Sequence, residues 1–322
     1  MTMSTTPLAT IAMVTYNSSA YVAQAIESVL CQSYENLELL ICDDYSSDNT
    51  RKIVQNYSDT RIRVILNEQN LGEYANRNQA ARLARGKYLI YIDGDDILYP
   101  HGLEFMVRML EAFPNSAMAI ARPWNEKIIY PVEFSPRQMY LSEYLGGGNI
   151  AINFAHVLFR TAVLQEVGGI DTRYKTGDAW IQLRIARDHP CLLISDGLAW
   201  WRRTPGQSSE ALLRNHASWP EYYQYRMEFL MHEDCPLTKE ESNIAISNIY
   251  STSSRLILKY ILKGRIGYAR KLIKKSKFPL RAWKFIRSSN LRNHLVEVNA
   301  GNPLFSEMKK NPFARFTEGE HI

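Results

Sequence analysis

The chain has 322 residues and a net charge of +5, and its hydrophobic (46%) and charged (22%) fractions are ordinary for a soluble globular protein. No apolar run reaches the length of a membrane span and the N-terminus shows no signal-peptide pattern, so we expect neither an integral membrane protein nor a secreted one. The four cysteines form no CxxC pair, which favours reduced thiols in a cytoplasmic protein.

Apolar runs and segments of helical spacing alternate through the first part of the chain, as in the predicted helices over residues 20–31 and 74–85. Strands that are apolar throughout are buried on both faces. This order therefore predicts an α/β fold of Rossmann-like type, with a mostly parallel sheet flanked by helices. The predicted strands are residues 10–14, 37–42, 62–66, 88–92 and 117–121. Gly86 is expected to end the second helix in a left-handed conformation.

Polar side chains follow four of these strands, at the point where each strand ends. In chain order they are Tyr16 and Asn17, then Asp43 and Asp44, then Asn67, then Asp93, Asp95 and Asp96. The carboxyl ends of parallel strands meet at one edge of the sheet, where open α/β proteins bind their ligands. We therefore expect these groups to converge.

The three carboxylates of Asp93, Asp95 and Asp96 lie within four residues. Like charges at this spacing repel, and a hard divalent cation such as Mg²⁺, bound by one or two carboxylates and by phosphate oxygens, would stabilise them. A solvated acidic turn that caps a helix opening at Pro100 is the alternative. Neither GxGxxG nor GxxxxGK[ST] occurs in this region, so a metal rather than a glycine-rich loop would hold phosphates.

The middle of the chain, residues 122–153, contains three prolines and a Gly-Gly-Gly run, and we expect irregular loop structure there. A strand-like run over 154–160 and a helix over 161–167 follow. Asp178 then lies in the first turn of a predicted amphipathic helix. A carboxylate at that position is also expected simply because it favours the helix dipole.

From about residue 210 the pattern becomes helical. We therefore expect a catalytic domain over 1–210 and a helical, basic region over 211–322. The segment Thr-Lys-Glu-Glu at 238–241 is a capping box that opens a long helix, and shorter basic segments follow around 268–277 and 279–287. Between Arg255 and Arg292 there are 13 Lys and Arg residues and no Asp or Glu, so the remaining chain is net negative. Such a split points to a local anionic partner.

Four blocks of sequence, in this order, resemble the inverting family 2 glycosyltransferases of GT-A fold, the bacterial nucleotide-sugar-dependent type. The resemblance spans roughly residues 8–210. The blocks are Ala-Met-Val-Thr-Tyr-Asn at 12–17 with Ser-Val-Leu-Cys-Gln at 28–32; Leu-Leu-Ile-Cys-Asp-Asp-Tyr-Ser-Ser-Asp at 39–48; Ile-Asp-Gly-Asp-Asp at 92–96, preceded by Asn-Leu-Gly at 70–72 and Arg-Asn at 77–78; and Val-Gly-Gly-Ile-Asp at 167–171 with Gly-Asp at 177–178.

The resemblance implies transfer of a sugar from a nucleoside-diphosphate donor, expected to be UDP-linked, to a hydroxyl of a glycan or lipid-linked glycan. The anomeric centre would be inverted, and the product would serve bacterial surface polysaccharide synthesis. It implies Mn²⁺ or Mg²⁺ bound by Asp95 and a catalytic base at Asp178. The implied nucleotide-binding residues are Thr15, Tyr16, Asn17, Asp43, Asp44, Asn70, Arg77 and Asp93. Many relatives carry a Tyr-Arg-x-His block whose histidine reaches the metal, whereas Thr204 stands at that place here.

Two other functions compete with this one. A catalytically inactive sugar-nucleotide-binding or scaffold protein of a cell-envelope complex is the main alternative, and the retention of Asp44, Asp95 and Asp178 together favours the enzyme. A nucleotidyltransferase also combines an α/β sheet, carboxylates and a metal. Such enzymes usually carry a glycine-rich basic loop after the first strand, and Thr-Tyr-Asn-Ser-Ser at 15–19 has neither glycine nor lysine.

The basic segment 255–292 has two interpretations. In one, it is a helical cap whose apolar stripe packs on the catalytic domain. In the other, it binds the anionic inner face of the cytoplasmic membrane, as a peripheral protein would. Nucleic acid is disfavoured as a partner, because the rest of the chain is net acidic and no recognition motif occurs.

Overall fold

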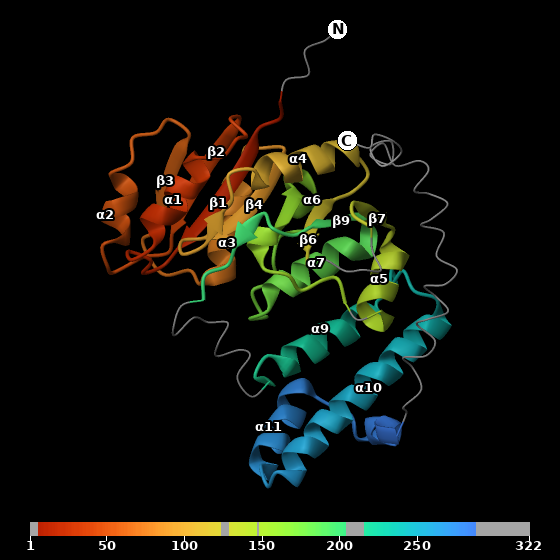
Figure 1. Ribbon diagram of the computed structural model, residues 1–322. Coiled ribbons are helices and arrows are strands. Elements are labelled where there is room, and N and C mark those ends of the chain that lie inside the picture. Colours follow the sequence, from red (N-terminus) through yellow and green to blue (C-terminus); the bar gives the residue numbers. More distant parts are fainter. Residues whose placement is uncertain (1–5, 124–128, 147, 204–215, 288–322) are drawn as a thin grey trace, which may run out of the picture.

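The computed structural model describes residues 6–123, 129–146, 148–203 and 216–287 (Figure 1). Its centre is an eight-stranded sheet of order β3-β2-β1-β4-β8-β6-β9-β7. The strands of this sheet are β1 (Ala9–Thr15), β2 (Leu37–Asp43), β3 (Ile62–Leu66), β4 (Tyr88–Asp93), β6 (Met118–Arg122), β7 (Val132–Phe134), β8 (Val157–Arg160) and β9 (Cys191–Ser195). A second, two-stranded sheet pairs β5 (Ile97–Leu98) with β10 (Ala199–Trp200).

The N-terminal half of the large sheet is parallel, as predicted. β1 pairs in parallel with β2 and with β4, and β2 pairs in parallel with β3. Strand β8 then enters antiparallel between β4 and β6, and β7 is antiparallel to β9 at the edge. The sheet is therefore mixed but mostly parallel, and the α/β expectation is confirmed with these two reversals added.

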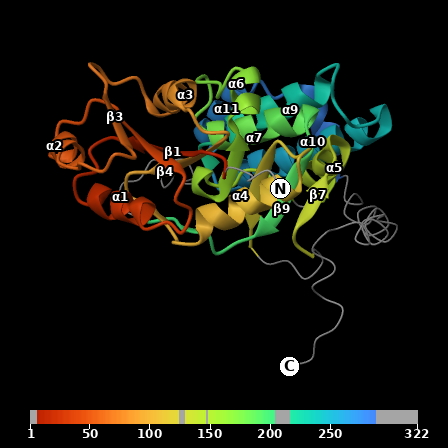
Figure 2. The same ribbon diagram turned by 90° about the horizontal axis from the view of Figure 1, so that it is seen from above.

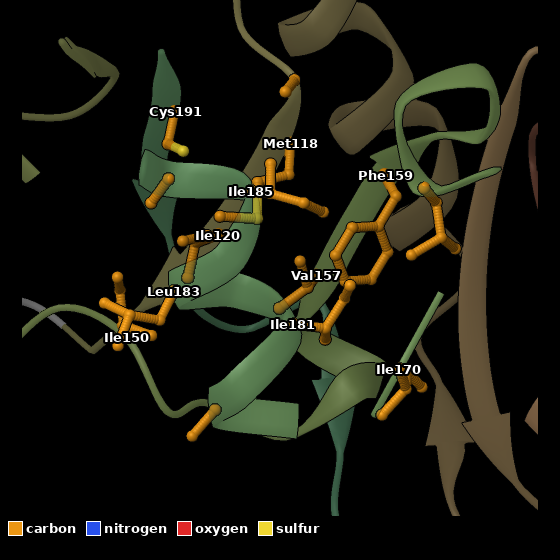
Figure 3. Packing of buried hydrophobic residues seen from close by; sticks show 14 of the residues in the cluster. Met118, Ile120, Ile150, Val157, Phe159, Ile170, Ile181, Leu183, Ile185 and Cys191 are labelled. Carbon is orange, nitrogen blue, oxygen red and sulfur yellow. The ribbon is translucent and has the colours of Figure 1, made fainter. Parts of the chain in front are cut away.

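Helices cover both faces of the sheet (Figure 2). On one face, α1 (Val22–Leu30) and α4 (Gly102–Ala112) pack their apolar sides against the strands, in a core that includes Ile26, Leu103 and Met106. On the other face lie α3 (Glu73–Leu83), α6 (Thr161–Glu166) and α7 (Gly177–Asp188). Figure 3 shows Ile181 and Ile185 of α7 beside Phe159 and Met118 of the sheet. A short helix, α2 (Thr50–Gln55), packs beside β2 and β3.

Residues 122–153 are more regular than their prolines suggested. They include strand β7 and helix α5 (Pro136–Leu145), so the prediction of irregular loop structure was wrong there. The helix begins with a capping box in which the Ser135 hydroxyl accepts from the Gln138 amide, and Pro136 occupies its first turn. This start signal is readable in the sequence. The helix predicted to open at Pro100 begins two residues later, at Gly102, with His101 as its N-cap. The two-residue strand β5 precedes Pro100 and was not predicted.

Gly86 does not end a helix, as the sequence had suggested. Helix α3 already ends at Leu83, and Gly86 is not among the glycines with positive φ. Its role is close approach: a Cβ at this position would lie 2.5 Å from the Thr10 nitrogen and 2.8 Å from the Ala9 carbonyl carbon. Both neighbours are backbone atoms of β1, which cannot move aside as a side chain could.

We expect Gly86→Ala to lower the free energy of unfolding by about 1–3 kcal/mol, because the added methyl group overpacks the β1 backbone. Denaturant unfolding of the two proteins would measure the difference. Gly267→Ala is the matched control, because no described residue comes within 4 Å of a Cβ placed there and the glycine lies inside a helix. Alanine favours helix, so the control should be neutral or slightly stabilising. Equal stability of Gly86→Ala and wild type would contradict the close-approach argument.

The C-terminal helices pack on the sheet domain and on one another. Helix α9 (Trp219–Met231) adds Tyr225 and Phe229 to the core that α7 also lines. Helix α10 (Lys239–Leu262) opens with the predicted capping box of Thr238 and Glu241. It lies beside α9 and α11 (Ile266–Ser276) (Figure 1). Together with the 3₁₀ helix η3 (Leu280–Arg287), these helices enclose a separate apolar cluster. The predicted domain boundary at 210/211 lies outside the described residues. Within the described ranges, no helix is both long and apolar enough to cross a membrane.

Candidate active site

Three strand ends meet at one edge of the sheet. In the parallel register Thr15 lies opposite Asp43, and Val14 lies opposite Asp93. The chain leaves each strand beside its neighbour: the Asp44 amide donates to the Thr15 carbonyl at 2.8 Å, and the Gly94 amide donates to the Val14 carbonyl at 3.0 Å. The predicted convergence of polar side chains at this edge is therefore confirmed. The individual roles of these residues remain predictions.

Asp43 is fully buried and holds the first two loops together. Its carboxylate accepts from the Thr15 hydroxyl at 3.0 Å and from the Ser46 amide at 3.0 Å, and the Arg51 guanidinium lies 3.5 Å away. Asn17 adds a second link between these loops, because its main-chain amide donates to the Ser46 hydroxyl oxygen at 2.9 Å. The carboxylate of Asp43 therefore joins the loops that follow β1 and β2.

Asp44 and Asn70 fix the loop that leads into α3. The Asp44 carboxylate accepts from the Leu71 amide at 2.8 Å and from the Gly72 amide at 2.9 Å, while the Asn70 side chain donates to the Asp44 carbonyl at 3.2 Å. A third donor is the Asn67 side chain, at 3.1 Å. A carboxylate has about four lone-pair directions, and these three donors occupy three of them in a side chain that is almost fully buried.

Two aromatic rings are exposed on the loops that follow β1 and β2. Tyr16 is 54% exposed and Tyr45 is 50% exposed. Tyr45 has a left-handed backbone (φ 68°), which is uncommon for a bulky residue, and the Arg51 guanidinium lies 5.8 Å from its ring centroid. Tyr16 was among the predicted nucleotide-binding residues, whereas Tyr45 was not. Its signal in the sequence is an aromatic residue directly after the Asp43–Asp44 pair.

Arg77 lies at the centre of a charged cluster behind the Asp93 strand end. Its side chain is 3% exposed and forms ion pairs with Asp93 and, at 3.4 Å, with Glu73, while the Phe154 ring centroid lies 4.8 Å from the guanidinium. Burial lowers the pKa of Arg77, but the two carboxylates raise it more, so the net pKa lies above its ordinary value. Arg77 therefore pairs with Asp93 in this structure. It would affect a nucleotide by orienting the Asp93 carboxylate, not by a contact of its own.

Glu73 was not predicted. Burial raises the pKa of its carboxyl, Arg77 lowers it, and the charges of Asp93 and Asp178 raise it further. The residue opens α3 directly after Gly72, whose left-handed backbone (φ 89°) turns the chain into the helix. The signal for Glu73 in the sequence is its spacing of four residues from Arg77, on the same face of a helix.

Asp178 reaches this cluster because α7 and α3 approach closely. A Cβ at Gly177 would lie 2.5 Å from Ile170 Cγ2 and 3.0 Å from the Tyr74 ring, so only glycine allows this contact. The Asn78 side chain also accepts from the Ile170 amide and donates to the Ile170 carbonyl, each at 2.8 Å. Helix α3 thereby fixes the segment that leads into α7 and places its first turn beside the cluster.

The half-buried carboxylate of Asp178 accepts from the Ala179 amide at 2.8 Å. Burial raises its pKa, the Ala179 bond and Arg77 lower it, Asp93 raises it, and the net pKa lies above its ordinary value. The Ala179 bond is also what a helix-terminal carboxylate would form. The geometry is therefore compatible with both predicted roles, and a raised pKa suits a general base.

The segment Asp-Gly-Asp-Asp follows β4 and packs against the first loop. A Cβ at Gly94 would lie 2.9 Å from Thr15 Cγ2, so glycine permits this contact. Asp96 is fully buried; one of its carboxylate oxygens accepts from the Arg202 amide at 3.0 Å, and the other has no hydrogen-bond partner among the described residues. Burial, reinforced by the charge of Asp93, raises the pKa of Asp96 to about 8. Asp95 is half-buried beside it.

The described residues contain no group of three or more His, Cys, Asp or Glu side chains arranged to hold a metal ion. A full protein cage is not what Mg²⁺ or Mn²⁺ needs at a phosphate site, where one or two carboxylates suffice and substrate oxygens supply the rest. The carboxylate of Asp95 fits this requirement. Thr204, at the place of the histidine in the related block, lies outside the described residues.

Known proteins resemble this chain in the region that carries these motifs. Residues 10–165 match the family model described as Glycosyl transferase family 2. WfgD of Escherichia coli, a UDP-Glc:alpha-D-GlcNAc-diphosphoundecaprenol beta-1,3-glucosyltransferase, is 43% identical over 103 residues, which cover 32% of this chain and 41% of that protein. WfaP of Escherichia coli, named for the same reaction, is 31% identical over 160 residues, which cover 48% of this chain and 62% of that protein. The matched stretches thus span about two fifths to three fifths of these relatives.

Solved structures share the fold across nearly the whole chain. The TarS 1-349 structure of S. aureus in complex with UDP-GlcNAc superposes with a TM-score of 0.67 at 16% identity and covers 97% of this chain and 93% of that one. The mannosyltransferase PcManGT of Pyrobaculum calidifontis, in complex with GDP-Man and Mn²⁺, gives a TM-score of 0.59 at 16% identity, covering 97% and 89%. The family model and the curated relatives thus show that residues 10–165 carry a glycosyltransferase family 2 domain, and the solved structures show that the chain has a GT-A fold.

Proposed function

We propose that this protein is an inverting, metal-dependent glycosyltransferase that uses a nucleoside-diphosphate sugar, expected to be UDP-linked. The acceptor would be a hydroxyl of a glycan or lipid-linked glycan in bacterial surface polysaccharide synthesis. The observation that carries the proposal is the meeting of the Asp44, Asp93–Asp95 and Asp178 segments at one sheet edge, from three separate parts of the chain. The curated relatives WfgD and WfaP, named for transfer to a diphosphoundecaprenol-linked sugar, support the acceptor class.

Donor binding is assigned to the loops that follow β1 and β2. The exposed Tyr16 ring offers a stacking surface for the base, and the remaining lone pair of Asp44 accepts from a base N–H. Asp93 is half-buried and held by Arg77, so it meets the ribose hydroxyls in a fixed orientation. A divalent cation on Asp95 would supply Lewis-acid stabilisation of the diphosphate leaving group.

Acceptor activation is assigned to Asp178. An attacking hydroxyl loses its proton as it bonds to the anomeric carbon, and a carboxylate on the face opposite the leaving group takes that proton. Attack from that face inverts the anomeric centre. The raised pKa of Asp178 strengthens it as a base, while Arg77 limits the rise and keeps the ionised form accessible.

A thermal-shift screen of UDP-, GDP- and dTDP-sugars with Mn²⁺ tests donor use, since a bound ligand stabilises the fold by mass action. We expect one nucleotide class to raise the melting temperature only when Mn²⁺ is present. Slow hydrolysis of the same donor would then separate an enzyme from an inactive sugar-nucleotide-binding or scaffold protein. Binding without any turnover, in the presence of candidate acceptors, would favour the inactive alternative.

The basic C-terminal helices also belong to this proposal. Their apolar stripe packs inside the protein: Ala269, Leu272 and Phe278 are buried against α9 and α10. The turn between α10 and α11, at the far end of the molecule from the sheet (Figure 1), instead exposes Leu262 (77%) and Ile266 (50%). Exposed lysines and arginines lie at this turn and along α11, namely Lys263, Arg265, Arg270, Lys271, Lys274, Lys275 and Lys277. Apolar tips within a basic surface suit the anionic inner leaflet of the cytoplasmic membrane.

We expect wild-type protein to sediment with anionic phosphatidylserine-containing vesicles at low salt and to be released as salt rises. Replacing Lys271, Lys274, Lys275 and Lys277 with Glu should abolish sedimentation, because each basic residue contributes about 1 kcal/mol near such a surface. Donor hydrolysis should be unchanged. Four Lys→Gln replacements at the same positions should give an intermediate loss. Wild type that stays in the supernatant at low salt would assign these helices a packing role only.

A further inference from the structure

Arg202 makes a set of contacts that the proposed reaction has not yet used. It lies just after β10, far along the chain from the Asp-Gly-Asp-Asp segment, and the antiparallel pairing of β10 with β5 brings the two together. The Tyr99 amide donates to the Leu198 carbonyl at 3.0 Å, and a Cβ at Gly102 would lie 2.4 Å from that same oxygen. The segment before Arg202 is thus fixed to the chain that follows the carboxylates.

The side chain of Arg202 is held from several directions. Its Nε donates to the Asp95 carbonyl at 2.7 Å, and its Nη2 donates to Gln24 Oε1 at 2.8 Å. The guanidinium carbon lies 4.5 Å from the Tyr21 ring centroid and 4.7 Å from the Trp200 ring centroid. A guanidinium is a rigid fork, so acceptors and rings on both sides define its orientation.

The main chain of Arg202 acts on the neighbouring carboxylate. Its amide donates to the Asp96 carboxylate at 3.0 Å, while its side chain holds the Asp95 carbonyl. One residue therefore fixes both positions that follow Gly94. The backbone of Asp95 is the base from which its side chain extends, so a contact on its carbonyl limits the positions that the carboxylate can take.

We propose that Arg202 is a positioning residue that preorganises Asp95 for the divalent cation and, through it, the donor diphosphate. This inference rests on the proposed function. Outer-shell partners of metal ligands typically change metal affinity by about 10–100-fold when removed. Arg202 connects the loop of Asp95 to the start of α1, through Gln24 in the helix and Tyr21 at its N-cap.

The test measures binding of UDP, GDP and dTDP by titration calorimetry, with Mn²⁺ and with EDTA. Arg202→Met keeps the unbranched stem and the main-chain bond to Asp96 but removes the side-chain donors. We expect it to weaken Mn²⁺-dependent binding by about 10–100-fold and to leave metal-free binding and the melting temperature of the apo protein near wild type. Arg202→Lys retains the charge without the fork and should behave like Arg202→Met. Arg203→Met is the matched control, since Arg203 is exposed and stacks on Trp201 at 5.2 Å; it should bind as wild type does.

Each other outcome is decisive. Wild-type affinity in Arg202→Met, or equal weakening with Mn²⁺ and with EDTA, would overturn the positioning role. Full recovery by Arg202→Lys would show that charge alone is needed and would also contradict it. If wild-type protein binds none of the three nucleotides in a Mn²⁺-dependent way, the proposed function fails, and this inference fails with it. A wild type that binds and an Arg202→Met variant that binds equally well would refute this inference alone.

Discussion

Asp178→Asn is expected to bind donor as wild type does and to transfer sugar about 10²–10⁴-fold more slowly. The amide preserves the size of the side chain and can still accept from the Ala179 amide, so the first turn of α7 should remain intact. It cannot take a proton from the acceptor hydroxyl. Calorimetric donor binding and a product assay with a glycan acceptor would measure the two quantities separately.

The pH profile provides a second measurement on the same residue. Burial raises the pKa of Asp178, so the base is lost by protonation at a higher pH than for an ordinary aspartate. Transfer by wild type should therefore fall on the acid side as Asp178 becomes protonated, and Asp178→Asn should lack this limb. Asp188→Asn at the other end of α7, where the carboxylate pairs with Arg184 and Arg187, is the control and should transfer normally. Near wild-type transfer by Asp178→Asn would leave Asp178 a helix-terminal carboxylate only.

Asp95→Ala is expected to remove the Mn²⁺-dependent part of nucleotide binding while the fold persists. The variant loses the carboxylate that fits the cation and keeps the main-chain carbonyl that Arg202 contacts. Removing one of three adjacent carboxylates also relieves repulsion, so the melting temperature without ligand should stay near that of wild type. Thermal shift with a nucleoside diphosphate, with Mn²⁺ or with EDTA, measures the effect.

Asp59→Ala is a suitable comparison for this experiment. Asp59 pairs with Arg61 before β3, at the end of that strand opposite the candidate site. Its removal should leave the Mn²⁺-dependent shift unchanged. An Asp95→Ala protein whose nucleotide binding depends on Mn²⁺ as strongly as wild type would show that the cation, if used, is held elsewhere.

Much of the first half of the fold could be predicted because the signals there are local. Mostly apolar runs of strand length, interrupted by Glu38 in β2 and Arg63 in β3, mark β1, β2, β3 and β4, and a polar group ends each run. Parallel pairing then places those ends together without further information. The later sheet could not be derived in this way, because the antiparallel entry of β8 between β4 and β6 depends on which strand edges the preceding chain leaves open.

The residues of the candidate site likewise fall into those that the sequence predicts and those that only the tertiary structure brings together. The sequence by itself determined the family motifs, the parallel strand ends and the carboxylates at them, because each depends on a few adjacent residues and on strand burial. Only the tertiary structure decided that Arg77 would be buried between Asp93 and Glu73, and that Arg202 would hold the loop of Asp95. Those contacts require α3, α7 and β10 to pack around one sheet edge. No local pattern specifies such an arrangement, since its energy comes from packing and desolvation between distant segments.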